Sequence, residues 1–190
     1  LYVTQVGAMQ NFYESLQTPM LKRMDTATIK VLNDKIDDLT REIQKFVREH
    51  EELRQQTEIM VSMPGIAILS AAIILAEIGP FRDFSNRNQI GAFCGLNPKQ
   101  KISGTSINRS KLSKAGSSFA RKIFYWDSTQ AIKHDPYLAD FYQRLIAKGK
   151  SPKTAKCACM RKVLTILRAM IASNRKYSPE LFSKNVPKTA

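Results

Sequence analysis

The chain has 190 residues, 43% of them hydrophobic and 24% charged, and a formal net charge of +14. This length and composition provide for one buried core with an extended appendage and exclude an array of several ordinary domains. No apolar run approaches the roughly 20 residues of a membrane-crossing helix, and no signal-peptide pattern opens the chain. We therefore expect a cytoplasmic protein with no membrane partner.

The basic residues are concentrated in the second half of the chain. Leu1–Asp83 holds 9 basic and 12 acidic residues, whereas Phe84–Ala190 holds 21 and 4. A half with this imbalance attracts a polyanion, and nucleic acid is the commonest polyanion inside cells. A membrane surface is the main competing partner, and a merely solubilising surface is the remaining alternative. Nucleic acid is therefore the expected partner.

Residues 1–62 are expected to form a helical arm. Apolar residues recur at alternating intervals of three and four, with only His50 breaking the series, at Ile29, Leu32, Ile36, Leu39, Ile43, Phe46 and Leu53. These heptads predict one long helix over 29–53 that pairs with another helix, in a coiled coil or an antiparallel hairpin. Met24-Asp25-Thr26 is interpreted as its cap. A shorter helix upstream is expected to fold back across a turn at Pro19, and His50 is interpreted as a tolerated polar residue of the seam.

Residues 63–176 are expected to form a compact basic helical domain, so that the fold class is mainly α. Pro64 and Gly65 end the long helix, and an almost wholly apolar helix follows over 67–78. Further helices are expected at about 86–93, 117–133, 136–147 and 152–173. The pairs Asp135-Pro136 and Ser151-Pro152 combine an N-cap with a first-turn proline, which fixes the start of the last two helices. Residues 177–190 are expected to be a loosely ordered tail.

The three cysteines are not expected to form a metal site or a disulfide. Cys94, Cys157 and Cys159 are an odd number and lack a second cysteine or histidine pair at zinc spacing. They are interpreted as reduced, buried apolar residues.

Between Gly95 and Gly116 the sequence predicts a glycine- and serine-rich loop that contacts phosphates. The basic residues from 99 to 122, with no acidic residue among them, are Lys99, Lys101, Arg109, Lys111, Lys114, Arg121 and Lys122. Thr105 and several serines add short hydrogen-bond donors, and Ser117 opens a helix N-terminus. Cations neutralise and short donors orient a phosphodiester, so phosphate binding is favoured over a merely solvated basic loop.

The last helix is expected to offer a second phosphate-binding surface. Arg161, Arg168 and Arg175 recur every seven residues and so share one face, while Cys159, Val163 and Met170 lie opposite and pack. Four aromatic residues upstream could stack on exposed bases, but aromatics at helical spacing are more often core, and the core interpretation is preferred. They are Phe119, Phe124, Tyr125 and Trp126.

The order and spacing of several short words resemble the transposase domain of the insertion-sequence-110 family, which includes the Piv-type DNA invertases. The words are Met63-Pro64-Gly65-Ile66, Leu75-Ala76-Glu77-Ile78-Gly79, Phe81 with Phe84, Gly91-Ala92-Phe93-Cys94-Gly95-Leu96-Asn97-Pro98, Ser103-Gly104-Thr105-Ser106, Leu112-Ser113-Lys114-Ala115-Gly116, Ala147-Lys148-Gly149-Lys150 and Met160-Arg161-Lys162. The resemblance runs from about Met63 to Ile171, and the helix upstream fits the family's coiled-coil arm.

The resemblance implies a bacterial, nucleoid-associated DNA transposase or site-specific recombinase of an insertion sequence. In such enzymes a serine of this domain attacks DNA and forms a phosphoserine link; here that serine would be Ser103, with Ser106 as the alternate. The resemblance also implies a second, upstream domain whose acidic residues bind Mg²⁺, so this chain is expected to be a C-terminal part with no cofactor of its own, inactive alone. A structured guide RNA and a homo-oligomer joined through the coiled-coil arm are further implied partners.

Three hypotheses follow for the function. The first is a serine-using recombinase component. The second is a non-catalytic helical module that binds nucleic acid, and the third is a coiled-coil scaffold whose basic half meets an acidic protein. One departure from the family pattern concerns Arg109, since the chain reads Ile107-Asn108-Arg109 where relatives commonly place an arginine directly after a Ser-Val pair. If Arg109 does not reach the same phosphate, that contact is displaced or lost.

Overall fold

The structure is a computed structural model that describes residues 2–15, 19–84, 86–103, 107–113 and 115–181, with backbone alone for most of 98–111. It is mainly α-helical, as expected. The chain divides into two compact units, Leu1–Glu49 and His50–Ala190. No helix in these ranges is long and apolar enough to cross a membrane.

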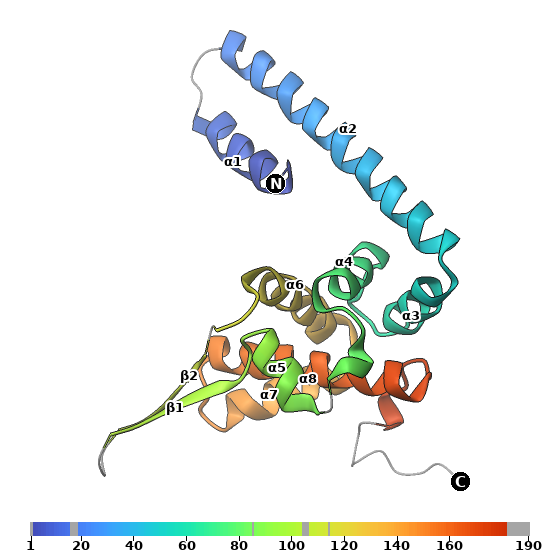
Figure 1. The fold of residues 1–190 in the computed structure, drawn as a ribbon. Helices are drawn as coiled ribbons and strands as arrows, with labels where there is room; N and C mark the ends of the chain where they lie inside the picture. Colours follow the sequence, from blue (N-terminus) through green and yellow to red (C-terminus); the bar gives the residue numbers. More distant parts are fainter. Residues whose placement is uncertain (1, 16–18, 85, 104–106, 114, 182–190) are drawn as a thin grey trace. The chain divides into compact units, whose positions relative to one another are not determined.

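The first unit is a pair of packed helices, α1 (Tyr2–Ser15) and α2 (Pro19–Glu49) (Figure 1). The predicted fold-back of a short helix onto a long one is therefore confirmed. The predicted cap at Met24-Asp25-Thr26 is wrong, because α2 already begins at Pro19. Proline has its φ preset for a first helical turn and no N–H to satisfy there, so it starts the helix earlier than the heptads do.

The single long helix expected over 29–53 is interrupted at His50. Its backbone is extended, with φ −112° and ψ 104°, and α3 (Glu51–Val61) starts at the next residue. Glu51 and Glu52 in the first turn of α3 favour a helix N-terminus through the helix dipole, and Arg54 closes that turn by pairing with Glu51 at 2.7 Å. His50 therefore separates two helices and is no seam residue. Accordingly α3 belongs to the second unit and not to an arm over 1–62.

The second unit is built around α8 (Pro152–Ser173), which contacts α3, α5, α6 and α7. The other helices are α4 (Ile68–Ile78), α5 (Arg87–Phe93), α6 (Ser118–His134) and α7 (Pro136–Ala147), with 3-10 turns η1 (Phe81–Asp83) and η2 (Pro179–Leu181). The helix starts predicted from Asp135-Pro136 and Ser151-Pro152 are confirmed, because both side chains cap their helices.

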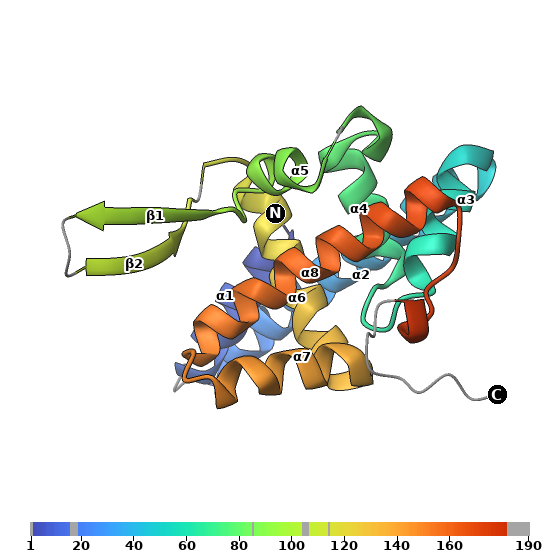
Figure 2. The ribbon, with the colours of Figure 1, turned by 90° about the horizontal axis from the view of Figure 1, so that it is seen from below.

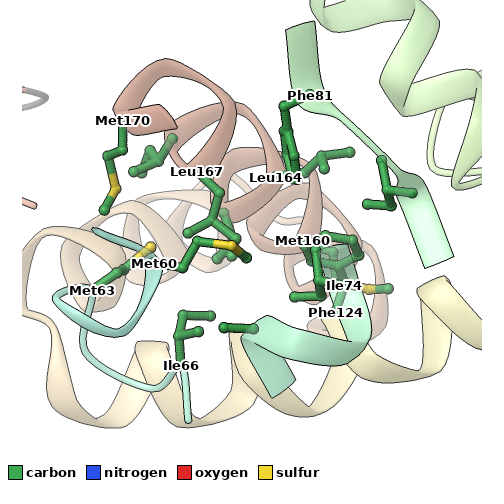
Figure 3. Close-up of a cluster of buried hydrophobic side chains, with 14 of the residues drawn as sticks. Met60, Met63, Ile66, Ile74, Phe81, Phe124, Met160, Leu164, Leu167 and Met170 are labelled. Carbon is green, nitrogen blue, oxygen red and sulfur yellow. The ribbon is translucent and has the colours of Figure 1, made fainter. Parts of the chain in front are cut away.

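The core of this unit gathers side chains from all six of its α-helices and from η1. Figure 3 shows Met60, Met63 and Ile74 facing Leu164 and Leu167 of α8. Cys94 and Cys159 are buried, as expected, whereas Cys157 is half-buried, and all three are free cysteines. A core that reaches from α3 to α8 holds the short helix α5 and the start of α6 in fixed positions, and these two helices carry the segment between residues 95 and 116.

A buried carboxyl group ties α4 to α6. The Ser70 hydroxyl lies 2.6 Å from both carboxylate oxygens of Asp127. Asp127 is only 6% exposed. Burial raises the pKa of Asp127 to about 6, and the hydrogen bond from Ser70 partly opposes that rise. The folded protein therefore binds a proton at this site more tightly than the unfolded chain does.

The Asp127→Asn variant should be more stable than the wild type at pH 7–8, by about 2 kcal/mol. The raised pKa means that Asp127 lowers the free energy of unfolding progressively as the pH rises from about 4 to about 6. Asparagine keeps a partner for Ser70 and carries no charge, so that decline should shrink. Urea unfolding between pH 4 and 8 measures it, with the exposed Asp140→Asn as control. Equal pH dependence in wild type and Asp127→Asn would contradict the assignment.

Candidate nucleic-acid interface

The segment expected as a glycine- and serine-rich loop is a β-hairpin. Strand β1 (Pro98–Ser103) pairs antiparallel with β2 (Ile107–Leu112), and Ser103 lies opposite Ile107 at the far end. Both views show the hairpin projecting away from the helices of the second unit (Figure 1 and Figure 2). With a rise of about 3.4 Å per residue, Ser103 stands about 17 Å beyond the base of the hairpin.

The register collects the basic positions on one face of the hairpin. Lys99 lies opposite Lys111, and Lys101 lies opposite Arg109. Residues two apart along a strand, and residues directly opposite on its partner, occupy the same face. The basic ribbon face therefore holds positions 99, 101, 103, 107, 109 and 111, while the other face holds Gln100, Ile102, Asn108 and Ser110 among its positions. Ser103, the candidate nucleophile, shares a face with all four basic positions of the two strands.

Like charges directly opposite one another destabilise a strand pair. Two such pairs on a two-stranded ribbon leave it stable only where other parts of the molecule fix its ends, or where a polyanion neutralises the charge. The basic ribbon face is thus suited to a phosphate backbone.

The base of the hairpin is fixed by backbone hydrogen bonds to α5 and to the start of α6. The Ser113 amide donates to the Asn97 carbonyl and the Ser117 amide to the Phe93 carbonyl, each at 2.9 Å. The Asn97 side chain in turn donates to the Asn88 carbonyl at 2.8 Å. We call residues 91–97, 113, 115–117 and 121 the hairpin junction. It sets the direction in which both strands leave the helical unit.

Close approach in the junction requires glycine at two positions. A Cβ at Gly116, where φ is +115°, would overlap the Phe93 carbonyl oxygen and lie 2.7 Å from that of Ala92. A Cβ at Gly95, where φ is +62°, would lie 2.6 Å from the Ala115 carbonyl oxygen. The glycines of this segment therefore serve packing between backbone segments.

Arg121 belongs to the junction as well. Its Nη1 donates to the Gly116 carbonyl at 3.1 Å and to the Cys94 carbonyl at 3.3 Å. The half-buried guanidinium holds the two sides of the junction together. Lys122, the next residue, is exposed on α6.

At the N-terminus of α6 the hydroxyl of Ser117 is engaged within the fold. The Ser117 hydroxyl caps the helix by accepting from the Ala120 amide at 3.0 Å, and it donates to the Glu77 carboxylate at 2.5 Å. A carboxylate already faces this helix end, and its charge opposes the approach of a second anion. The prediction that Ser117 opens a helix is confirmed, and phosphate binding at this helix end stays a prediction.

The arginine series expected on one face of the last helix is only partly present. Arg175 lies beyond α8, whose cap is Asn174 in the left-handed conformation. Arg168 donates to the Phe84 carbonyl at 2.9 Å and so fastens the turn after η1. Arg161 is half-buried on α8. The predicted packing face is confirmed, since Cys159, Val163 and Met170 are all buried.

Three of the predicted nucleic-acid or catalytic residues lie outside the described residues. These are Thr105, Ser106 and Lys114. The described ones therefore divide into the basic ribbon face, the junction residue Arg121 with Lys122 beside it, and the α8 residues.

The core interpretation of the α6 aromatics holds for Phe124 alone, which is fully buried. Phe119, Tyr125 and Trp126 are 51%, 43% and 58% exposed, so for them the expectation is wrong. The reason is that α6 packs through small and polar side chains, with Ala120, Asp127, Ser128 and Ala131 buried in place of the rings. The alternative that the sequence left open, stacking on exposed bases, therefore stays available for these three rings.

The acidic residues of the basic half do little to offset its charge. Asp127 and Asp135 are buried and bonded inside the fold, to Ser70 and to the Leu138 amide respectively. Asp140 pairs with Arg144 at 2.9 Å. The exposed charge of residues 84–190 is therefore at least as basic as the sequence count indicates.

A family model and several curated relatives match the chain. Residues 57–143 match the model of the Transposase IS116/IS110/IS902 family. The pilin gene-inverting protein of Moraxella bovis is 27% identical over 155 residues, 80% of this chain and 48% of that protein. The transposase for insertion sequence element IS1111A of Coxiella burnetii is 23% identical over 191 residues, 92% of this chain and 51% of that protein.

A third relative is the insertion element IS110 uncharacterized 43.6 kDa protein of Streptomyces coelicolor, 26% identical over 123 residues, 65% of this chain and 30% of that protein. The chain thus spans about half the length of these relatives or less. The matched residues 57–143 include α4, α5, the hairpin, its junction and α6. Residues 57–143 therefore hold a domain of the transposase IS116/IS110/IS902 family, and the chain is similar to the C-terminal part of these relatives.

Proposed function

We propose that this chain is the nucleophile-bearing part of a DNA transposase or site-specific recombinase of an insertion sequence. In the proposed reaction the Ser103 hydroxyl oxygen attacks a DNA phosphorus, the bond from that phosphorus to one deoxyribose oxygen breaks, and that oxygen leaves with a proton. The product is a phosphoserine link between protein and DNA.

The observation that supports this proposal most is the place of Ser103 in the hairpin register. It is the last residue of β1, at the end remote from the junction, and it shares the basic ribbon face with four cationic positions. Phosphoryl transfer accumulates negative charge on the phosphate oxygens, and cations held beside the attacking hydroxyl stabilise that charge. A projecting ribbon also reaches a duplex without moving the helical unit.

The metal ion that the family resemblance implies does not fit the described part of this chain. No three His, Cys, Asp or Glu side chains there lie close enough together to bind one. We therefore propose that the Mg²⁺ site belongs to acidic residues of a segment that precedes this one in the complete protein, and that this chain by itself does not cleave DNA.

We propose DNA as the substrate, a structured guide RNA as a further partner, and a homo-oligomer joined by a coiled coil of α2. Two heptad residues of α2 support the last point, since Leu39 and Phe46 are 49% and 54% exposed. Exposed large apolar side chains in a heptad series are stabilised when a second helix covers them.

The test is a covalent adduct formed by a protein extended upstream through the acidic segment, with Mg²⁺, the element's end sequence and its RNA. Wild type should yield a denaturant-resistant protein–DNA species that mass spectrometry maps to Ser103. Ser103→Ala should abolish it, a loss of at least about a hundredfold. Ser110→Ala, on the opposite face of the hairpin, is the matched control and should retain it. Ser106→Ala tests the alternate nucleophile.

A non-catalytic helical module that binds nucleic acid is the second candidate, and the charge of residues 84–190 favours it equally. It predicts salt-sensitive binding and no adduct from any variant, because counterion release governs affinity in both cases. An adduct that survives Ser103→Ala would contradict the nucleophile assignment, and a bound complex without adduct would favour this module.

A further inference from the structure

A second feature of the basic half lies on α6, away from the hairpin strands. Phe119, Tyr125 and Trp126 are all about half exposed, and none of the core or the junction requires their rings. Large aromatic side chains that remain in contact with solvent mark interaction surfaces more often than isolated aliphatic ones do. Their spacing along the helix indicates what they contact.

Phe119 and Trp126 are seven residues apart and so lie on one face of α6, with exposed Lys122 between them. Two helical turns separate the rings by about 10 Å, which is the rise of about three stacked nucleotides at ~3.4 Å each. The lysine stands midway, where the phosphates between two stacked bases would pass. We call Phe119, Lys122 and Trp126 together the α6 stripe.

The α6 stripe is supported from α8. Lys156 Nζ lies 4.5 Å from the centre of the Tyr125 ring and 3.4 Å from its hydroxyl oxygen. Tyr125 in turn meets Trp126 edge to face, with ring centres 5.8 Å apart. A cation–π pair and a T-shaped pair restrain the indole, so the side chain loses little conformational entropy when a planar ligand stacks on it.

The charge around the α6 stripe distinguishes between possible ligands. The only acidic residue of α6 is Asp127, which is buried against Ser70, so the exposed face carries Lys122 and Lys133 with no exposed carboxylate from this helix. A ligand that binds this basic face therefore carries negative charge. Rings that alternate with cations match the alternation of bases and phosphates in a nucleic acid strand.

We propose that the α6 stripe binds single-stranded nucleic acid by stacking unpaired bases on Phe119 and Trp126. Bases inside a duplex present only their edges, so rings on a helix surface reach them only when the strand is unpaired or locally opened. The inference rests on the proposed nucleic-acid function and assigns to this face a separate role from that of the hairpin, which meets the backbone.

The test uses Trp126 itself, because it is the only tryptophan of the chain. Adding a 12-nucleotide oligo(dT) or oligo(U) to the 190-residue chain should quench its intrinsic fluorescence, whereas a 12-base-pair duplex should bind with little quenching. Comparison of the two oligonucleotides distinguishes DNA from RNA as the source of the strand. Lys122→Gln should reduce the slope of log affinity against log salt by about 0.7.

Leucine variants separate stacking from ordinary apolar contact. Phe119→Leu and Trp126→Leu, followed by anisotropy of a labelled oligonucleotide, should each weaken single-strand binding about tenfold while duplex affinity changes less than twofold. A protein partner that merely buries apolar surface would accept leucine. Both side chains are exposed, so the variants should retain the wild-type circular dichroism spectrum.

Binding of the oligonucleotide without quenching, or with unchanged affinity in both leucine variants, would overturn the α6 proposal and leave the Ser103 proposal intact. Loss of self-association in Trp126→Glu, with single-strand binding unchanged, would reassign the face to a second copy of the chain and also overturn it. Failure of the chain to bind either form of nucleic acid would contradict this proposal and the proposed function together.

Discussion

Replacing Gly116 by alanine should lower the free energy of unfolding by about 3 kcal/mol or more. Two independent terms combine at this position. The backbone φ of +115° is one that residues with a Cβ rarely adopt, and the added methyl group would overlap the Phe93 carbonyl oxygen. Neither neighbour is the flexible end of a side chain, so α5 or the start of α6 would have to move.

Gly149→Ala is the matched control for the backbone term. Its φ is +74°, yet nothing lies within 4 Å of the position that a Cβ would take. This variant should therefore lose only about 1 kcal/mol. Urea unfolding followed by circular dichroism measures both changes, and the difference between the two variants isolates the cost of the close contact.

Hydrogen exchange locates the damage. In Gly116→Ala the Ser117 and Ser113 amides, which bond to Phe93 and Asn97, should lose protection, while amides in the middle of α8 should lose only what the global destabilisation accounts for. Equal stability losses in the two glycine variants would show that Gly116 has room for a side chain and that the junction is looser than described.

The helices of the second unit could be predicted because their ends carry local chemical signals. Asp135 and Ser151 accept hydrogen bonds from amides of the turns that they begin, and a proline follows each of them. Such signals act within four residues, so no knowledge of the tertiary structure is needed. The prediction of α7 and α8 agrees with the structure at both ends.

The break at His50 could not be deduced from the heptad pattern. His50 is the one polar position of the series, and Leu53 resumes the spacing beyond it, so the pattern alone does not mark the end of a helix there. The helices before and after His50 differ in what they pack against. Ile59 and Met60 of α3 pack into the core of the second unit, and this long-range packing decides where the new helix starts.

The hairpin could not be predicted from the local pattern. From Lys99 to Ser103 only Ile102 is apolar, so the segment lacks the apolar–polar alternation of a half-buried strand. The lysines, serines and asparagine of this segment have low β-propensity and favoured a loop interpretation. Strand pairing is set by the turn and by the hydrogen bonds of the junction. The junction bonds depend on contacts with α5, and a local sequence pattern does not show such contacts.

Of the candidate site, the sequence and its resemblance identified Ser103 and the basic positions, but not the face that they share. The alignment of Lys101 with Arg109 follows from the register alone. Conversely, Arg121 and Arg168 were predicted to bind phosphate from the residue type alone, whereas in the structure they donate to backbone carbonyls. Arginine serves equally well in holding loops together, since its guanidinium presents several donors in one plane.

The shared face leads to a prediction about affinity for duplex DNA. Lys101→Gln with Arg109→Gln removes two positive charges from directly opposite positions on the basic ribbon face. The affinity of the 190-residue chain for a 20-base-pair duplex should fall about 30-fold, and the slope of log affinity against log salt should decrease by about 1.8. Fluorescence anisotropy between 50 and 300 mM salt measures both quantities.

The matched control makes the same change in net charge on the other face. Gln100→Glu with Ser110→Glu also lowers the charge by two, again at directly opposite positions. If the basic ribbon face meets the phosphates, this pair acts only through the long-range field and should weaken binding about threefold. Equal losses in the two double variants would mean that net charge governs binding and that the face does not. A larger loss in the first pair alone ties affinity to the face that also carries Ser103, because the phosphates held by Lys101 and Arg109 would then lie beside the attacking hydroxyl.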